Sequence, residues 1–157
     1  MLSNLGNILL FINVFLSVLI IYFASQNIKT SGNSISKTIY QTTLLQTTLI
    51  FGCFFTLVAA FITSDFSLIN VYENSHTSKP LLYKISGSWG NHEGSLMLWV
   101  IILTIFSFFF LINNKTHPKN YRLFTLIFQN IIILGFLSFI LFNSNPFTLI
   151  SPAPKEG

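Results

Sequence analysis

Four long apolar runs constrain this chain more than any other feature of its sequence. They cover roughly residues 5–23, 44–62, 96–112 and 124–142, and none of them contains Asp, Glu, Lys or Arg. A helix of about 20 apolar residues crosses the hydrocarbon core of a bilayer. Backbone polar groups in lipid must be paired within the segment, which favours helices. The runs therefore predict an all-α integral membrane protein with about four transmembrane helices.

The composition supports a membrane environment. Of the 157 residues, 52% are hydrophobic and only 8% are charged, whereas soluble domains carry about 25% charged residues. The formal net charge of +4 could indicate nucleic-acid binding, but the basic residues are spread through short loops and form no patch. We therefore expect a lipid bilayer, and no nucleic acid, as a partner of this chain.

The charges in the loops predict how the chain is oriented. The first loop, 24–43, and the third loop, 113–123, contain only basic charges, whereas the second loop, 63–95, contains two lysines and three acidic residues. Because basic loops stay on the cytoplasmic or matrix side of a membrane, loops one and three are expected there. Both termini and loop 63–95 would then face the periplasm or the intermembrane space. The predicted location is a bacterial cytoplasmic membrane or the mitochondrial inner membrane.

Loop 63–95, about thirty residues long, is the one substantial extramembrane segment that the sequence predicts. Apolar residues alternate partially around Tyr72 and over Leu82–Ile85, with Pro80 as a break. We interpret this loop as short extended segments and turns. The tail, 143–157, contains three of the five prolines and is expected to be extended. The tail also suggests that the chain is incomplete.

The stretch "SGSWGNHEGSLMLWV", Ser86 to Val100, places polar residues directly before the third apolar run. Asn91 or Ser88 is expected to cap the third helix. Glu93 would lie in its first turn, where the helix dipole favours a carboxylate. In a purely structural interpretation, His92 is an interfacial histidine bonded to a backbone carbonyl or to Glu93, and the two tryptophans are interface aromatics.

The spacing of four residues in this stretch allows a second interpretation. Trp89, His92, Leu96 and Trp99 are three or four residues apart and would form one stripe if the helix begins early enough. An imidazole between two indoles suits a flat aromatic ligand, and imidazole is a ligand of haem iron. The same stripe is also typical of a contact between helices. Trp89, His92 and Trp99 are therefore candidate cofactor-binding residues, and both interpretations remain open.

The remaining residues predict no catalytic centre and no metal site. His76 and His117 are single loop histidines that we expect to be solvated. The sequence contains no Cys-x-x-Cys-His segment, no metal-spaced Cys/His set, no nucleophile–base pair and no glycine-rich phosphate loop. The one cysteine, Cys53, cannot form an internal disulfide. No residue is therefore assigned a catalytic role.

The stretch resembles the signature of the CcmF family, the haem-lyase component of cytochrome c maturation. That signature is a Trp-x-x-His-Glu-Gly-Ser element followed by a hydrophobic helix with a Trp in its first turns. The matching residues are Trp89, His92, Glu93, Gly94, Ser95 and Trp99. The tail "NSNPFTLISPAPKEG" and the first span, with Gly6 near its start, are also similar to the family.

The resemblance implies that this chain is part of a longer assembly that acts in cytochrome c maturation. Such an assembly receives haem at the outer face and joins its vinyl groups to the Cys-x-x-Cys-His thiols of apocytochrome c. Family members are several times longer and carry a Trp-rich WWD segment and further histidines that ligate haem, which no position here matches. Residues 1–157 are accordingly expected to be the N-terminal membrane portion and to be inactive alone. The implied partners are a complementary C-terminal CcmF piece if the gene is split, other cytochrome c maturation membrane proteins, and apocytochrome c.

Two other classes of protein would have a similar composition. A small structural membrane subunit of a respiratory complex would show the same number of spans, but that class does not explain the His-Glu-Gly-Ser element. A transporter fragment would show a polar or broken helix at mid-membrane. Gly52, Cys53 and Thr56 in the second span and Gly135 in the fourth are slight departures of this kind, and they also fit close helix packing.

Overall fold

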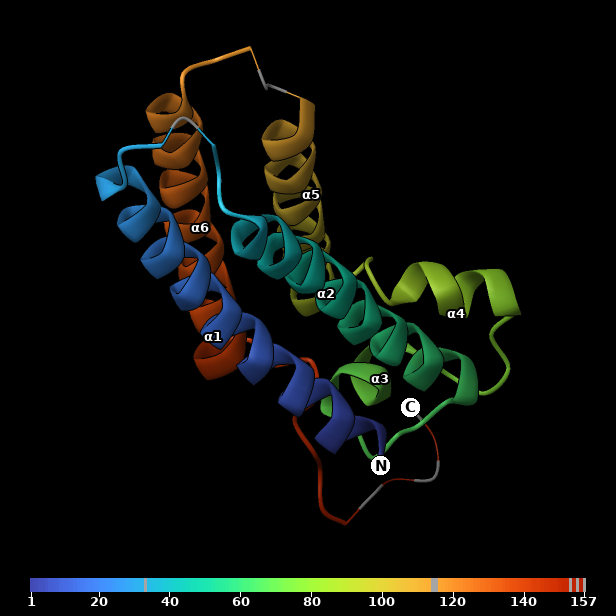
Figure 1. The fold of residues 1–157 in the computed structure, drawn as a ribbon. Helices are drawn as coiled ribbons and strands as arrows, with labels where there is room; N and C mark the ends of the chain where they lie inside the picture. The colour runs from blue at the N-terminus through green and yellow to red at the C-terminus, as the bar shows by residue number, and fades with distance from the viewer. Residues whose placement is uncertain (33, 114–115, 153, 155, 157) are drawn as a thin grey trace.

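The structure, a computed structural model, describes residues 1–32, 34–113, 116–152, 154 and 156. Among these residues, four helices are long and apolar enough to cross a membrane, which confirms the predicted number of spans. They are α1 (Leu2–Lys29), α2 (Lys37–Thr63), α5 (His92–Asn113) and α6 (Lys119–Asn143). Figure 1 shows that consecutive long helices run antiparallel and form one bundle. The predicted all-α membrane fold is thus confirmed.

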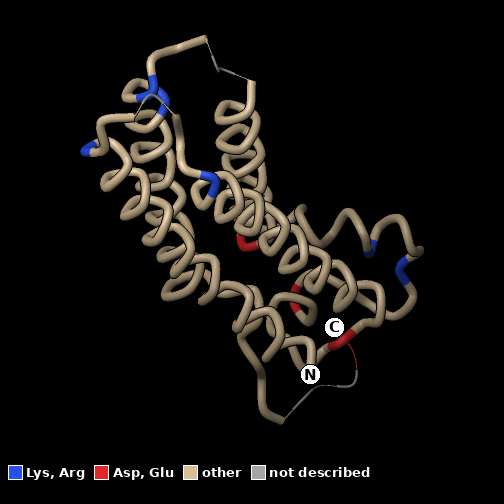
Figure 2. Tube along the Cα trace, viewed as in Figure 1, with Lys and Arg blue, Asp and Glu red and all other residues tan. Residues whose placement is uncertain are grey.

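The two ends of the bundle differ in their loops and in their charge. We name them the loop end, which holds both chain ends and the connection from α2 to α5, and the basic end, which holds the other two connections (Figure 1). Figure 2 shows basic residues alone at the basic end and the acidic residues at the loop end. Lys29, Lys37, Lys119 and Arg122 belong to the basic end. The fold therefore brings together the loops that the charge pattern grouped.

Each long helix extends beyond the apolar run that predicted it. α1 continues through a polar segment to Lys29, and α2 already begins at Lys37. Ser36 caps α2, because its Oγ accepts a hydrogen bond from the Thr38 N–H at 3.3 Å. α2 ends before Ser64, whose φ of 53° is left-handed. Bilayer thickness therefore sets the apolar length, whereas capping and turn residues set the ends of the helices.

Each long helix packs against two of the others. α1 contacts α2 and α6, and α5 contacts the same two helices, so α1 and α5 lie diagonally across the bundle. A larger apolar core includes Leu57, Met97 and Leu137, and a smaller core includes Ile20 and Leu123. Burial of such side chains against neighbouring helices gives the bundle its close packing.

A layer of polar side chains crosses the middle of the bundle. Gln46 Nε2 of α2 donates a hydrogen bond to Ser17 Oγ of α1 at 2.7 Å. Thr47 Oγ1 of α2 donates to the Thr104 carbonyl of α5 at 3.3 Å, and a glutamine of α6 donates to a backbone carbonyl of α5. Polar contacts of this kind help to hold helices together in lipid. This layer was not predicted, because the spans contain no charged residue that would mark it.

The connection from α2 to α5 differs from its prediction. Instead of extended segments, it contains two short helices, α3 (Ile69–Asn74) and α4 (Leu81–Gly87), and α4 packs against α2. Pro80 does act as a break, because it directly precedes α4 and its carbonyl accepts hydrogen bonds from Tyr83 and Lys84. Short apolar runs fit a strand and a helix equally well, which explains the wrong prediction.

The tail after α6 is not helical over its described residues, as predicted, but it is not extended throughout, because it turns at residues 146–147 and bends at residues 151–152. It packs against the loop end. An isolated antiparallel bridge joins Leu149 to Leu68 in the connection before α3. Phe147 is fully buried, and its carbonyl accepts a hydrogen bond from Ser3 Oγ at 2.8 Å. A side chain at Gly6 would run into the Phe147 ring. The tail therefore belongs to the fold and ties the end of α6 to the start of α1.

Candidate functional site at the start of α5

The Trp-x-x-His-Glu-Gly-Ser element lies at the loop end, where α5 begins. Asn91 caps this helix, because its Oδ1 accepts a hydrogen bond from the Gly94 N–H at 2.7 Å. Ser88, the other candidate cap, is buried and donates instead to the Ile85 carbonyl at 2.7 Å. The structure thus selects Asn91 between the two predicted caps and places Glu93 in the first turn, as expected.

His92 is the first residue of α5 and points toward the end of α6. Its Nδ1 lies 3.1 Å from Ser144 Oγ, and its ring meets the Phe139 ring edge-on with centroids 6.4 Å apart. This differs from the predicted contact with a backbone carbonyl or with Glu93. Among the described residues, the Nε2 atom has no hydrogen-bond partner. The imidazole is therefore oriented through one nitrogen and has the other nitrogen available.

Glu93 connects α5 to α3. Its Oε2 accepts a hydrogen bond from Asn70 Nδ2 at 3.3 Å, and the same amide also donates to Asn91 Oδ1 at 3.3 Å. Asn70 is only 4% exposed, so this carboxylate reaches a largely buried partner. His92 and Glu93 thus take different partners, and the polar pair expected between them does not form.

Gly94 allows the chain to pass closely over the first turn of α5. A Cβ atom at this position would run into the backbone carbonyl of Ser88. Glycine is therefore the one residue that fits here without a shift of the preceding turn. Ser95 Oγ donates to the His92 carbonyl at 2.8 Å and stays within its own helix.

The two tryptophans lie in different surroundings. Trp89 belongs to the turn before α5 and its ring lies 6.4 Å from the Phe54 ring of α2. The predicted stripe of four residues therefore does not form, because the helix begins three residues after Trp89. His92, Leu96 and Trp99 still share one face of α5. Trp99 is 58% exposed and faces away from the core.

An apolar groove lies between α5 and α6 beside His92. It has a volume of about 340 Å³ and is lined by Leu96, Ile132, Gly135, Phe136 and Phe139. Phe139 also contacts the His92 ring, so the imidazole stands at the margin of this groove. A side chain at Gly135 would project into open space. The groove can accept a flat apolar group or another helix next to an imidazole.

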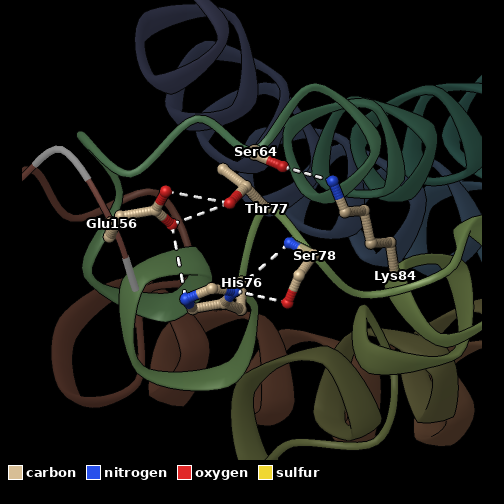
Figure 3. Close-up of polar contacts among 6 residues, drawn as sticks. All are labelled: Ser64, His76, Thr77, Ser78, Lys84 and Glu156. Carbon is tan, nitrogen blue, oxygen red and sulfur yellow. Dashed lines mark hydrogen bonds and ion pairs between the residues drawn. The ribbon is translucent and has the colours of Figure 1, made fainter.

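The other loop histidines have no comparable surroundings. His76 Nε2 lies 3.5 Å from the Glu156 carboxylate and its Nδ1 lies 2.8 Å from Ser78 Oγ, so it is not simply solvated as expected (Figure 3). Thr77 donates to both oxygens of Glu156 at 2.9 Å. His117 is exposed and lies beside the Tyr121 ring. Neither histidine adjoins the groove.

The residues that hold the signature in place were not predicted from the sequence. Asn70, Phe139 and Ser144 come from α3, α6 and the residue after α6, far along the chain from His92. No local pattern marks them, because their role arises from the packing of distant elements. The one available signal was the presence of an asparagine among the apolar residues "LINVY".

Comparison with known proteins relates this arrangement to a family, although no protein-family model matches the chain. The cytochrome c-type biogenesis protein Ccl1 of Rhodobacter capsulatus is 50% identical over 114 residues, which cover 73% of this chain and 18% of the relative. The cytochrome c-type biogenesis protein CcmF of Haemophilus influenzae is 33% identical over 165 residues, which cover 100% of this chain and 24% of the relative.

A solved structure shows the same fold. A cytochrome c heme lyase CcmF matches with a TM-score of 0.83 and 22% identity, over 94% of this chain and 25% of that protein. The chain thus spans between 18% and 25% of the length of these proteins. From these similarities in sequence, supported by the shared fold, the chain belongs to the CcmF family of cytochrome c-type biogenesis proteins.

Proposed function

We propose that this chain is the N-terminal membrane portion of a CcmF-type haem lyase and acts in cytochrome c maturation. Membership of the family supports this role, and because the chain spans only 18% and 24% of the length of these relatives, we propose that the activity belongs to a larger assembly. The observation that carries the proposal is the convergence of the signature at the loop end. Trp89, His92 and Glu93 contact α2, the end of α6 and α3, respectively.

The surroundings of His92 fit a position beside haem. Imidazoles that bind a metal through one nitrogen usually hold the other nitrogen in a hydrogen bond to a second residue. Ser144 provides such a partner for Nδ1, and Nε2 is free among the described residues. The adjoining apolar groove, with Leu96 and Phe139, suits the edge of a porphyrin. When bound, haem supplies the iron and the vinyl groups on which thioether formation depends.

The residues of this chain would bind and orient haem without acting as catalysts. Ser144 fixes the direction of the His92 ring, and Asn91 with Gly94 fixes the start of the helix that carries it. Trp99 would extend the aromatic surface along the same face of α5. We assign the further haem ligands and the attachment chemistry to the remaining portion of the assembly.

The proposed orientation places the loop end on the periplasmic or intermembrane-space side. The basic end carries Lys29, Lys37, Lys119 and Arg122 among its described residues, and the sequence has no acid before Asp65. Such an excess of Lys and Arg in short loops favours the cytoplasmic or matrix side. The His92 surroundings would then lie on the side where we place apocytochrome c.

The partners follow from the same proposal. A complementary C-terminal CcmF portion would cover the groove between α5 and α6, and apocytochrome c and other membrane proteins of cytochrome c maturation would meet the assembly at the loop end. The relatives reported above carry names of cytochrome c biogenesis proteins. Those names favour this function over that of a structural subunit of a respiratory complex.

A complementation experiment tests the division of labour. The chain is produced in cells that lack their own haem lyase, alone and together with the complementary portion of a CcmF protein. Covalent haem on a reporter cytochrome c is then measured. We expect no attachment from either piece alone and attachment from both together. Attachment by this chain alone, or no gain from adding the complementary portion, would contradict the proposal.

A further inference from the structure

Two cations are buried at the basic end without a carboxylate partner. Lys119 and Arg122, in the first turn of α6, are 7% and 6% exposed. The sequence contains no acidic residue before Asp65 or between Glu93 and Glu156, so no carboxylate of these segments can balance the two charges. Lysine and arginine are rarely buried this deeply unless an opposite charge is present.

Contacts with carbonyl groups balance these cations only in part. Lys119 Nζ donates to the carbonyls of Thr30 at 2.9 Å and Gly32 at 2.7 Å, just after α1. Arg122 donates to the Leu111 carbonyl in the last turn of α5 and to the Tyr40 hydroxyl of α2 at 2.9 Å, and both partners are uncharged. The C-terminus of a helix carries roughly half a negative charge. Two full charges therefore remain incompletely compensated, and the Nε atom of Arg122 is buried without a hydrogen-bond partner.

A polar recess opens directly beside Lys119. It has a volume of about 230 Å³ and lies between residues 28–32 and residues 118–120. A water molecule occupies about 30 Å³ of liquid, so the recess has room for a group of several heavy atoms. The N-terminus of α6 follows Pro118 and has no side-chain cap, which adds partial positive charge at the same place.

We propose that this recess binds the phosphate of an anionic phospholipid headgroup. The charge calls for an anion, and the recess lies at the end of membrane-spanning helices, where anionic headgroups are concentrated. The exposed Lys29 at the end of α1 adds a further cation at this end of the bundle. Lipid binding at the basic end is independent of haem handling at the loop end, so each proposal can fail without the other.

Native mass spectrometry of the whole purified chain tests this site. The chain is equilibrated with equal amounts of phosphatidylglycerol and phosphatidylcholine, and the lipids that remain bound are counted. Wild type should retain phosphatidylglycerol preferentially. Lys119→Gln keeps a hydrogen-bond donor but removes the charge, and should lower this preference about fivefold, the size expected for one cation near an anionic surface. The matched control is Lys84→Gln at the loop end, where Lys84 Nζ bonds Ser64 Oγ at 2.6 Å (Figure 3).

The outcomes separate lipid from free phosphate. We expect Lys84→Gln to keep the preference for phosphatidylglycerol, and we expect inorganic phosphate not to displace this lipid from wild type. An equal preference for phosphatidylglycerol in wild type and Lys119→Gln would contradict the proposed site. Displacement by inorganic phosphate would overturn the assignment to lipid. If Lys119→Gln does not fold, the wild-type chain still tests the proposal. Equal retention of phosphatidylglycerol and phosphatidylcholine by wild type would contradict it.

Discussion

The loop end and the basic end of the same bundle are built by different chemistry. At the loop end, side chains such as His92 and Glu93 bond other side chains from separate elements, Ser144 and Asn70. At the basic end, cations such as Lys119 bond backbone carbonyls where a helix stops. The first arrangement orients particular groups relative to one another, whereas the second leaves net positive charge. This contrast underlies our two proposals, a specific ligand at the loop end and an anionic headgroup at the basic end.

The largest expected effect concerns His92, the residue that most distinguishes the loop end. His92→Ala in the complementation assay should lower covalent haem on the reporter cytochrome by about 10- to 100-fold, a range typical of residues around metal sites. Its physical cause is the loss of the one imidazole beside the groove. His76→Ala and His117→Ala are matched controls and should retain near wild-type attachment. Equal effects from all three would remove His92 from the site.

Gly94 lies in a closely packed turn, whereas Gly135 faces open space, so substitutions at the two glycines should have different effects. Gly94→Ala should destabilise the bundle by about 2 kcal/mol, the usual size of overpacking, because the new Cβ meets the Ser88 carbonyl. Gly135→Ala should be neutral or stabilising by up to about 1 kcal/mol, because its Cβ would enter open space and alanine favours a helix. Unfolding in mixed detergent micelles measures both. A Gly94→Ala chain as stable as wild type would show that the turn before α5 shifts easily.

A smaller effect is expected from the asparagines at the starts of two helices. Asn91→Ala removes the cap of α5 and should cost about 1 kcal/mol of unfolding free energy. Asn120→Ala, at the basic end, should change stability little, because Asn120 is exposed and α6 has no side-chain cap. The same unfolding assay applies. Similar losses of unfolding free energy for Asn91→Ala and Asn120→Ala would show that the two helix starts do not differ in their capping.

The parts of the fold that local sequence determines were predictable. The four spans followed from uninterrupted apolar runs, and Asn91 was one of the two predicted caps because capping is a short-range pattern. The short helices α3 and α4 were not predicted, since six or seven residues show no clear period. The contacts of His92 were also out of reach, because Ser144 lies 52 residues away along the chain.

Burial of the loop cations was equally hidden from the sequence. Lys119 and Arg122 were expected as loop charges that report orientation, and the structure buries both against the ends of α1 and α5. A charge pattern locates such residues along the chain but does not show whether they face solvent. That property depends on where neighbouring helices end, which capping and turn geometry decide at positions outside the apolar runs.

The orientation of the bundle is the claim on which the proposed function depends most directly. Single cysteines are introduced as Tyr83→Cys at the loop end and Lys37→Cys at the basic end, in a Cys53→Ser background, and intact cells or mitoplasts are treated with a membrane-impermeant maleimide. Tyr83 is 67% exposed and Lys37 is exposed, so the bundle itself covers neither position. We expect labelling at position 83 without permeabilisation and labelling at position 37 only after it. The reverse pattern would place the His92 surroundings on the cytoplasmic or matrix side and contradict the proposed orientation.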